Sequence, residues 1–539
     1  MGRRRVADIL PPLLLLAAAA VIRVATAAPP PLTADGTVYL QIARNILSGW
    51  GLGWEASWMP PGLSILVAAG SYLSGEQNIL TVAGWVASLS YILLVPLLYE
   101  FGRRIDSPLS GGAAALLTAT SPHILWIAST PEPEMLYTFF LCSALLFMLI
   151  ALDRGSTPAA IGAGLTASAA YHARSEALVI LFFVAILLLM SRTVRQTGGG
   201  RIVAVAVVTM LLSMIPYLLF LKGYYRGWVL SPKGSYVMIW MKGKTYQEHE
   251  KGEIFNDELW GLTPDGRYRW QEPKGVSDLL SYLAKDPLKS LRVYLRDISH
   301  ELPGNIPNNS GMDHYPQVVP LYLAIPLTIF LLLPSPRGVG KKILLAAPLL
   351  IFFIFPLFTD GWWKYLVPYL PLVILMGVVG CRLAIVRFIP KERLRPLLFG
   401  CFVLFITLRF VAPRLIQSTG GGEPSTEGRM IYAREVEMAG MWGVQRFGRG
   451  RHYLSPWSKI VYHLDGRWSA EPVAPLPDVH RFALERGVDL VVKEAVGDSY
   501  RPEDLTTPPP GFVLRGLYRS LTHPYMVGFY APVPIGSDR

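Results

Sequence analysis

Charged residues lie at the ends of several long apolar stretches, and their types suit acid–base chemistry. Asp35 follows the first apolar stretch, residues 9–28. A carboxylate held where a helix leaves the lipid can act as a base at the water–lipid boundary. Three more carboxylates, Glu132, Glu134 and Glu176, lie at comparable positions in other stretches. The topology predicted below places all four on one side of a membrane, and this convergence makes them candidates for a functional site.

Each of these groups also has a structural interpretation. Glu132 and Glu134 precede an apolar stretch, and acids at a helix N-terminus interact favourably with the helix dipole. Arg174 and Glu176 can form an ion pair with each other in a location where charge is costly. Lys364 lies in the aromatic segment Trp-Trp-Lys-Tyr, which is typical of an anchor at the membrane interface.

Composition indicates the class of protein that positions these residues. The chain has 539 residues, of which 52% are hydrophobic and 16% charged. Its mean hydropathy is +0.37. Soluble domains are usually about a quarter charged. Repeated apolar runs near the length that crosses a bilayer therefore predict an α-helical polytopic membrane protein. The three cysteines lie inside apolar runs and indicate neither a disulfide framework nor a metal cluster.

The sequence predicts eleven membrane-spanning helices. Their ranges are 9–28, 79–101, 111–128, 135–152, 159–170, 177–190, 202–221, 318–334, 343–358, 363–381 and 396–412. Basic residues concentrate in alternate connections, beginning with the N-terminal Arg3-Arg4-Arg5. The short outer connections hold almost none: Arg44, Arg174 and the boundary residue Lys364. This asymmetry predicts a cytoplasmic N-terminus in the cell (inner) membrane, with the site and the C-terminus extracytoplasmic. Much of the net charge of +12 is thus topological, and nucleic acid is not expected as a partner.

The spans divide the chain into two predicted domains. Residues 1–412 form the membrane domain, with large extracytoplasmic loops at 29–78 and 222–317. Residues 413–539 form a small extracytoplasmic α/β domain. A helical pattern followed by a short β-branched run typical of a buried strand indicates the α/β class.

Three shorter patterns predict individual elements within these two domains. In the second large loop, residues 276–298 have the periodicity of a helix. In the C-terminal tail, residues 433–447 are predicted to form a helix and residues 488–493 a strand.

The spans 159–170 and 177–190 are each too short to cross a membrane comfortably. If they formed one continuous helix, every later basic loop would lie outside. They are predicted to be a broken pair, with irregular backbone at 171–176 lining a cavity.

The N-terminus has two interpretations. Arg3-Arg4-Arg5, an apolar run and the small residues 25–27 resemble a cleaved signal peptide. Arg23 interrupts the run, and the stretch is long enough to span, which favours a retained anchor. Either arrangement leaves Asp35 outside.

Five segments in order resemble motifs of the GT-C superfamily of glycosyltransferases, in the branch of protein O-mannosyltransferases and lipid A aminoarabinose transferases (bacterial family-39-like). They are Asp35–Leu47, Met59–Gly62, Glu134–Phe140, Arg174–Leu178 and Lys364–Pro371. Ser175 replaces the proline of an Arg-Pro-Glu signature, and Lys364 replaces the arginine of an Arg-Tyr motif. The resemblance covers roughly residues 9–380 and implies the GT-C fold.

The resemblance implies sugar transfer from a polyprenyl-phosphate donor to a hydroxyl on a lipid, glycan or protein acceptor in the cell envelope. Phosphate leaves without a general acid, so a base and one or two cations suffice. The family pattern assigns the base to Asp35 and an assisting role to Glu134.

The same pattern places Tyr39, Arg174, Glu176, Lys364 and Tyr365 at the substrate. The basic pair would hold phosphate, the arginine through its planar fork and the lysine as a point charge. Glu176 would hold Arg174 in place. No cofactor is expected, and a divalent metal has no support in the sequence.

Two other functions stay open at this point. A transporter or flippase can also contain a broken helix and charges at depth, but it predicts inverted repeats and a midplane site, and neither is evident. An oligosaccharide-transferring or ligase-like enzyme would share the lipid donor and move a glycan in place of one sugar. The identity of the sugar and of the acceptor stays open as well.

The predicted orientation has a direct test. Alkaline phosphatase fused after Gly421 should be active, because an odd number of spans follows a cytoplasmic N-terminus. A fusion near Lys391 should be inactive. The reverse pattern of activities would overturn the orientation and the outward position of the acids.

Overall fold

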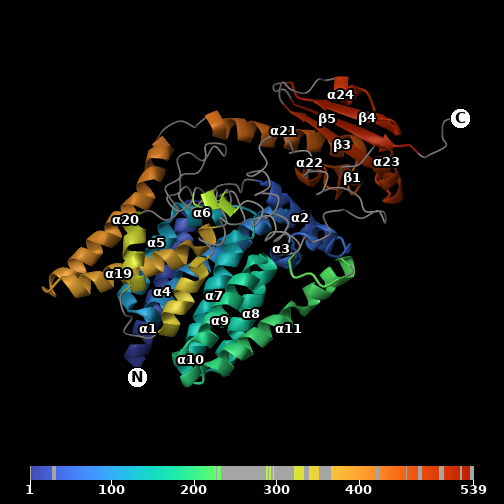
Figure 1. Ribbon diagram of the computed structural model, residues 1–539. Helices are drawn as coiled ribbons and strands as arrows, with labels where there is room; N and C mark the ends of the chain where they lie inside the picture. The colour runs from blue at the N-terminus through green and yellow to red at the C-terminus, as the bar shows by residue number, and fades with distance from the viewer. Residues whose placement is uncertain are drawn as a thin grey trace. The chain divides into compact units, whose positions relative to one another are not determined.

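The computed structural model describes residues 2–26, 32–225, 227–231, 287–288, 291–292, 295, 321–332, 339–350, 366–419, 424–456, 458–471, 476–496, 503–521 and 525–533. The chain forms two compact units (Figure 1). The helical unit comprises Met1–Pro31, Ser57–Met241 and Val276–Gly421. The α/β unit comprises Leu32–Ala56, Lys242–Gly275 and Gly422–Arg539. The predicted helix at 276–298 lies almost entirely outside the described residues.

The helical unit is built from long helices joined by short connections. Its elements are α1 (Gly2–Ala25), α3 (Gly62–Ser74), α4 (Ile79–Ile105), α5 (Pro108–Thr120), α6 (Pro122–Ile127), α7 (Glu134–Arg154), α8 (Thr157–Ala173), α9 (Glu176–Met190), α10 (Arg192–Gln196), α11 (Gly199–Tyr225), α16 (Leu321–Leu332), α17 (Val339–Ala346), η4 (Ala347–Leu350), η7 (Val367–Tyr369), α19 (Leu370–Phe388) and α20 (Leu394–Thr419). Helix α8 packs between α7 and α11, and α4 packs against α5 and α7 (Figure 1).

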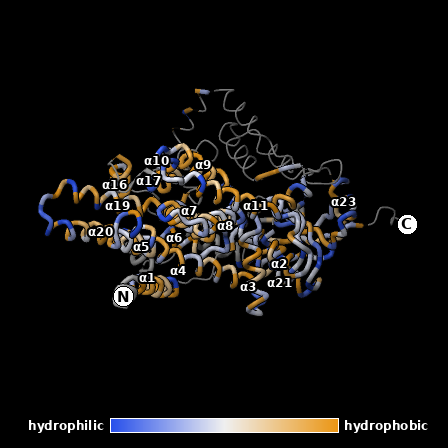
Figure 2. The backbone as a smooth tube through the Cα atoms, turned by 90° about the horizontal axis from the view of Figure 1, so that it is seen from below, coloured by the Kyte–Doolittle hydropathy of each residue, from blue (hydrophilic) through white to orange (hydrophobic). Residues whose placement is uncertain are grey.

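Several of these helices have the dimensions of membrane spans. Within the described part of the chain, Ile79–Ile105, Glu134–Arg154, Gly199–Tyr225 and Val367–Phe388 are long and apolar enough to cross a bilayer. Figure 2 shows hydrophilic residues gathered at the turn between α19 and α20, the location of Lys391. The predicted class, a multi-pass helical membrane protein, is confirmed, while the number eleven stays a prediction.

Glycine allows close helix contacts inside the unit. A Cβ added to Gly102 of α4 would lie 2.6 Å from the Cα of Gly111 in α5. A Cβ on Gly111 would lie 2.3 Å from the Tyr99 carbonyl oxygen. Since lipid tails provide little hydrophobic drive between helices, such small-residue contacts are the typical means of packing them.

The predicted span 111–128 and the predicted pair 159–170 and 177–190 differ from the observed helices. The single span predicted at 111–128 is wrong in its continuity, because α5 ends at Thr120 and α6 starts at Pro122. The ring of Pro122 disfavours a helical conformation at the preceding Ser121, whose ψ is 122°. The predicted break in the pair 159–170 and 177–190 is present but shorter than expected. Helix α8 continues to Ala173, so only two residues separate it from α9.

The α/β unit contains a five-stranded mixed sheet in the order β2-β1-β3-β5-β4. The strands are β1 (His452–Ser455), β2 (Arg467–Ala470), β3 (Leu490–Val496), β4 (Phe512–Arg519) and β5 (Tyr525–Pro532). Strand β1 is parallel to β2 and β3, while β5 is antiparallel to β3 and β4. Parallel neighbours need a crossover, and α22 (Ser458–His463) and α23 (Leu476–Glu485) provide it.

The small C-terminal α/β domain expected from the sequence is confirmed. The predicted strand at 488–493 corresponds to β3, and the predicted helix at 433–447 lies within α21 (Pro424–Phe447). Short α24 (Glu503–Thr506) completes the unit.

One segment from the first outer loop joins this unit. Helix α2 (Ala34–Leu47) and the 3₁₀ turn η1 (Glu55–Ser57) lie in or at the edge of residues 32–56, and α2 packs on α22 and β2. The sequence had grouped this segment with the membrane domain. The division into domains 1–412 and 413–539 itself stays a prediction.

A buried polar chain stabilises the turn after α2. Gln41 donates to the Asn45 side-chain oxygen at 3.2 Å, and the Asn45 amide donates to the Glu55 carboxyl at 3.2 Å. Gly53 has φ of +73°, and a Cβ there would lie 2.2 Å from Glu55 Oε2. Burial raises the pKa of Glu55 to about 7, although the bond from Asn45 and the charge of Arg467 act in the opposite direction.

The raised pKa of Glu55 predicts a pH dependence of stability. Its unfolded value is 4.5, so between pH 4.5 and 7 the folded state binds more protons than the unfolded state. The free energy of unfolding should therefore fall as pH rises through this window, by up to about 3 kcal/mol, and level off above pH 7.

Glu55→Gln should flatten this profile, as measured by thermal denaturation between pH 5 and 8. The matched control is Glu485→Gln at an exposed position at the end of α23, which should keep the wild-type slope. Equal slopes in all three proteins would contradict the assignment to Glu55.

Candidate active site

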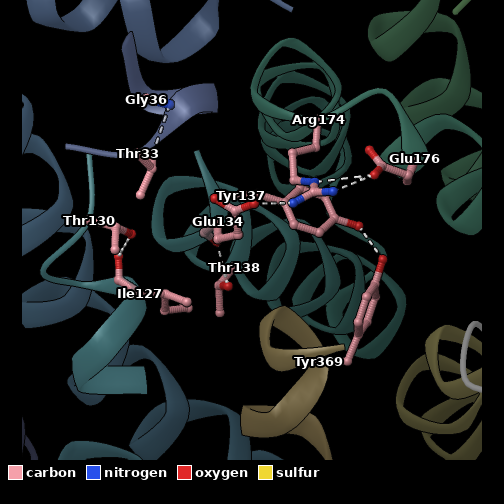
Figure 3. Close-up of polar contacts among 10 residues, drawn as sticks. All are labelled: Thr33, Gly36, Ile127, Thr130, Glu134, Tyr137, Thr138, Arg174, Glu176 and Tyr369. Carbon is pink, nitrogen blue, oxygen red and sulfur yellow. Dashed lines mark hydrogen bonds and ion pairs between the residues drawn. The ribbon is translucent and has the colours of Figure 1, made fainter. Parts of the chain in front are cut away.

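The centre of the candidate site is an arginine between two carboxylates. Arg174 Nη1 forms an ion pair with Glu134 Oε1, and Arg174 Nη2 forms one with Glu176 Oε1 at 2.6 Å (Figure 3). The Nε of Arg174 also donates to Glu176 Oε1, at 3.3 Å. The sequence placed these three residues at one site, and the structure brings them together.

Helix ends position all three groups. Glu134 and Glu176 are the first residues of α7 and α9, where a negative charge interacts favourably with the helix dipole. Arg174 is the C-cap of α8 with extended backbone angles, φ −149° and ψ 125°. The break between α8 and α9 therefore points the guanidinium toward the start of α7.

Burial makes the ion pairs of this cluster important for stability. The side chains of Glu134 and Arg174 are 3% and 8% exposed, while that of Glu176 is 26% exposed. Ionised groups out of water are retained where they are paired, and at membrane depth they mark functional sites. Among the described residues, no group hydrogen-bonds to Glu134 Oε2. That oxygen is thus an available acceptor in a buried, charged setting.

Two tyrosines extend the cluster. Tyr137 lies one turn after Glu134 on α7, and its hydroxyl is 2.6 Å from that of Tyr369 in η7 (Figure 3). The rings meet edge to face with centroids 6.0 Å apart, and both side chains are fully buried. Both tyrosines lie in segments that resemble family motifs, Glu134–Phe140 and Lys364–Pro371, but neither was predicted as a site residue. The spacing of three residues from Glu134 was the available signal, since such positions share a helix face.

Asp35 and Tyr39 lie in the α/β unit. Thr33 caps α2 by accepting a hydrogen bond from the Gly36 amide at 3.0 Å (Figure 3). Asp35 occupies the first turn of the helix. Asp35 is half-buried, whereas Tyr39, one turn later on the same side of the helix, is 4% exposed. The cap and the helix dipole hold the carboxylate at a defined point of the backbone.

The remaining candidates have separate outcomes. Lys364 and Tyr365 lie outside the described residues. Glu132 is buried at 3% exposure two residues before α7. Within the part of the chain that the structure describes, no three His, Cys, Asp or Glu residues group closely enough to hold a metal ion. The absence of a cofactor stays a prediction.

Known proteins share both a sequence pattern and the fold. The family model described as dolichyl-phosphate-mannose-protein mannosyltransferase matches residues 59–220. No curated protein sequence matches the chain.

Among solved structures, ArnT from Cupriavidus metallidurans bound to undecaprenyl phosphate is 13% identical, with a TM-score of 0.54 over 96% of this chain and 97% of that chain. The oligosaccharyltransferase AglB from Archaeoglobus fulgidus, in complex with an inhibitory peptide and a dolichol-phosphate, is 13% identical, with a TM-score of 0.53 over 89% of this chain and 69% of that one.

The chain thus has the fold of membrane glycosyltransferases, and residues 59–220 match a family of mannosyltransferases. The resemblance seen in its motifs to GT-C glycosyltransferases agrees with the mannosyltransferase family model over residues 59–220 and with the fold of these solved structures. Of the classes considered from the sequence, the enzyme is therefore supported and the transporter is not.

The buried cluster predicts unequal effects of its members on stability. Arg174→Ala removes the partner of an almost fully buried carboxylate and should cost about 3–5 kcal/mol. It should lower the midpoint of thermal denaturation in detergent clearly. Glu176→Gln should cost less, because that side chain is partly exposed and Arg174 keeps Glu134.

The matched control is another ion pair of the helical unit. Asp153 pairs with Lys341 at 3.2 Å, with side chains 33% and 15% exposed. Asp153→Asn should cost less than about 1 kcal/mol, as is usual for solvated pairs. Equal denaturation midpoints for Arg174→Ala and Asp153→Asn would show that the buried cluster contributes no more to stability than a solvated ion pair does.

Proposed function

We propose that the protein transfers a sugar from a polyprenyl-phosphate carrier to an acceptor hydroxyl at the extracytoplasmic face of the inner membrane. The observation that carries this proposal is the buried cluster of Glu134, Arg174 and Glu176, built at helix ends within a GT-C fold. The relative from C. metallidurans, aligned over almost its whole length, is bound to undecaprenyl phosphate, which supports a lipid-phosphate carrier for this chain as well.

The chemistry requires a base and charge neutralisation. The acceptor oxygen forms a bond to the anomeric carbon while the bond from that carbon to the carrier phosphate breaks. Asp35 takes the proton of the attacking hydroxyl, and polyprenyl phosphate leaves with the electron pair. The second carboxylic acid that glycosidases use to protonate the leaving group is unnecessary, because phosphate departs as a stable anion.

The other site residues divide the remaining tasks. Glu134 Oε2, which no described residue hydrogen-bonds, accepts a hydrogen bond from the acceptor and orients it. Arg174, held in place by its ion pairs with Glu134 and Glu176, contributes its guanidinium to the phosphate. Lys364, with Tyr365 beside it in the sequence, supplies the point charge for the phosphate. Tyr39 lines the side of α2 on which Asp35 lies.

Transfer of a whole oligosaccharide is the second candidate, because the oligosaccharyltransferase of A. fulgidus shares the fold. Coverage favours the smaller transfer, since the chain aligns with 97% of ArnT but 69% of AglB. Native mass spectrometry of the purified protein distinguishes the two: a copurified lipid phosphate with one sugar supports the proposal, and a lipid-linked glycan supports the alternative.

The role of Asp35 predicts a selective kinetic defect. Asp35→Asn keeps the shape of the side chain but removes its ability to take a proton. Turnover should fall by about 10² to 10⁴, the usual contribution of a positioned base. Binding of undecaprenyl phosphate should change little, because the base acts on the acceptor. Transfer rate, lipid affinity and thermal stability are measured on the same purified variant.

Lys364→Ala is the matched variant with the opposite expectation. It should weaken binding of undecaprenyl phosphate by roughly 1.5–3 kcal/mol, the worth of a hydrogen bond to a charged group. Full activity of Asp35→Asn would refute the proposed base, and equal loss of rate and lipid affinity would indicate a structural role for Asp35.

A further inference from the structure

Helix α2, which carries Asp35, is attached to the C-terminal part of the chain through a buried hydroxyl pair. Thr37 Oγ1 and Ser458 Oγ, the latter at the start of α22, are 2.5 Å apart although 421 positions separate them in the sequence. Thr37 is fully buried and Ser458 nearly so. Both residues lie inside the α/β unit, so the contact is part of one compact body.

A second attachment lies two turns further along α2. Arg44 Nη2 donates to the Tyr462 carbonyl oxygen at 3.2 Å and forms an ion pair with Asp465 Oδ1 at 3.4 Å. The guanidinium also lies over the Tyr462 ring, 5.1 Å from its centroid. Asp465 adopts a φ of 50°, a conformation uncommon for a residue other than glycine, in the turn between α22 and β2.

The two attachments lie on one face of α2, since Thr37 and Arg44 are seven residues apart, which is close to two helical turns. The segment that follows α2 is tied to the same surface. Trp54 donates from its indole nitrogen to the Trp468 carbonyl at 3.5 Å, and the two ring centroids are 5.2 Å apart. The segment from Thr37 to Trp54 is therefore held at three points by α22, the turn after it, and β2.

We propose that Arg44 and Thr37 are positioning residues, and that the C-terminal domain thereby sets the orientation of the Asp35 carboxylate. Asp35 is two residues before Thr37 in the same rigid helix, so rotation or displacement of α2 moves its carboxylate. This proposal rests on the proposed function of Asp35. It assigns to the C-terminal part of the α/β unit a role in holding the proposed base.

The first experiment measures the attachment without activity. In Arg44→Ala and Thr37→Val, hydrogen exchange of residues 34–47 in the full-length protein should be faster than in the wild type. The matched control is Arg449→Ala. Arg449 pairs with the same Asp465 carboxylate at 3.6 Å, but it is 78% exposed and lies outside α2. Its removal should leave the exchange of α2 unchanged.

The second experiment uses cells that lack the native protein and express one variant each. Transfer is measured as the amount of envelope glycan product that the variant restores. Arg44→Ala and Thr37→Val should reduce the product roughly 10- to 100-fold, the scale expected for slight misplacement of a reacting group. Binding of undecaprenyl phosphate and the denaturation midpoint should stay near wild type. Arg449→Ala should restore the full amount.

The double variant Asp35→Asn with Arg44→Ala tests whether Arg44 acts through Asp35. Its product should equal that of Asp35→Asn alone, because a displaced carboxylate has no effect once the base is removed. Losses that multiply would overturn the proposal, as would wild-type exchange and product in Arg44→Ala. Full product from Asp35→Asn would defeat the proposed base, while the exchange experiment still decides whether Arg44 holds α2.

Discussion

The arrangement of the buried charged cluster depends on the two ion pairs of Arg174. A guanidinium and two carboxylates in a poorly hydrated interior are tolerated only when they neutralise one another. This requirement joins the start of α7, the end of α8 and the start of α9 at one point. The break between α8 and α9 is part of the same arrangement, because a continuous helix would not present an extended Arg174 to Glu134.

The helices of the helical unit pack closely around this cluster. Helix α7 is enclosed by α4 and α8, and the Tyr137–Tyr369 contact links it to the turn that opens α19. Glycine contacts such as Gly102 with Gly111 bring neighbouring helices together where lipid offers little drive for association. Close packing around the charged cluster holds its charges at fixed positions, as the proposed function requires.

The α/β unit holds the Asp35 carboxylate on a short helix. An isolated helix as short as α2 is marginal in water, so it needs packing against another element. The contacts of Thr37 and Arg44 with α22 and the turn after it supply that packing. The polar chain from Gln41 to Glu55 closes the turn beyond the helix and adds a group that titrates near neutral pH.

The sequence by itself determined the class of protein, the break near Arg174, the α/β character of the tail and the candidate residues at helix ends. Those features depend on local properties: apolar length, loop charge, period and motif. Tertiary structure decided the rest. Pro122 divided a predicted span that hydropathy alone presents as continuous. The contacts of Arg174 with Glu134, Tyr137 with Tyr369, and Thr37 with Ser458 join residues 40, 232 and 421 positions apart. Pairings of that kind depend on which helix faces meet in the folded chain, and no local pattern records them.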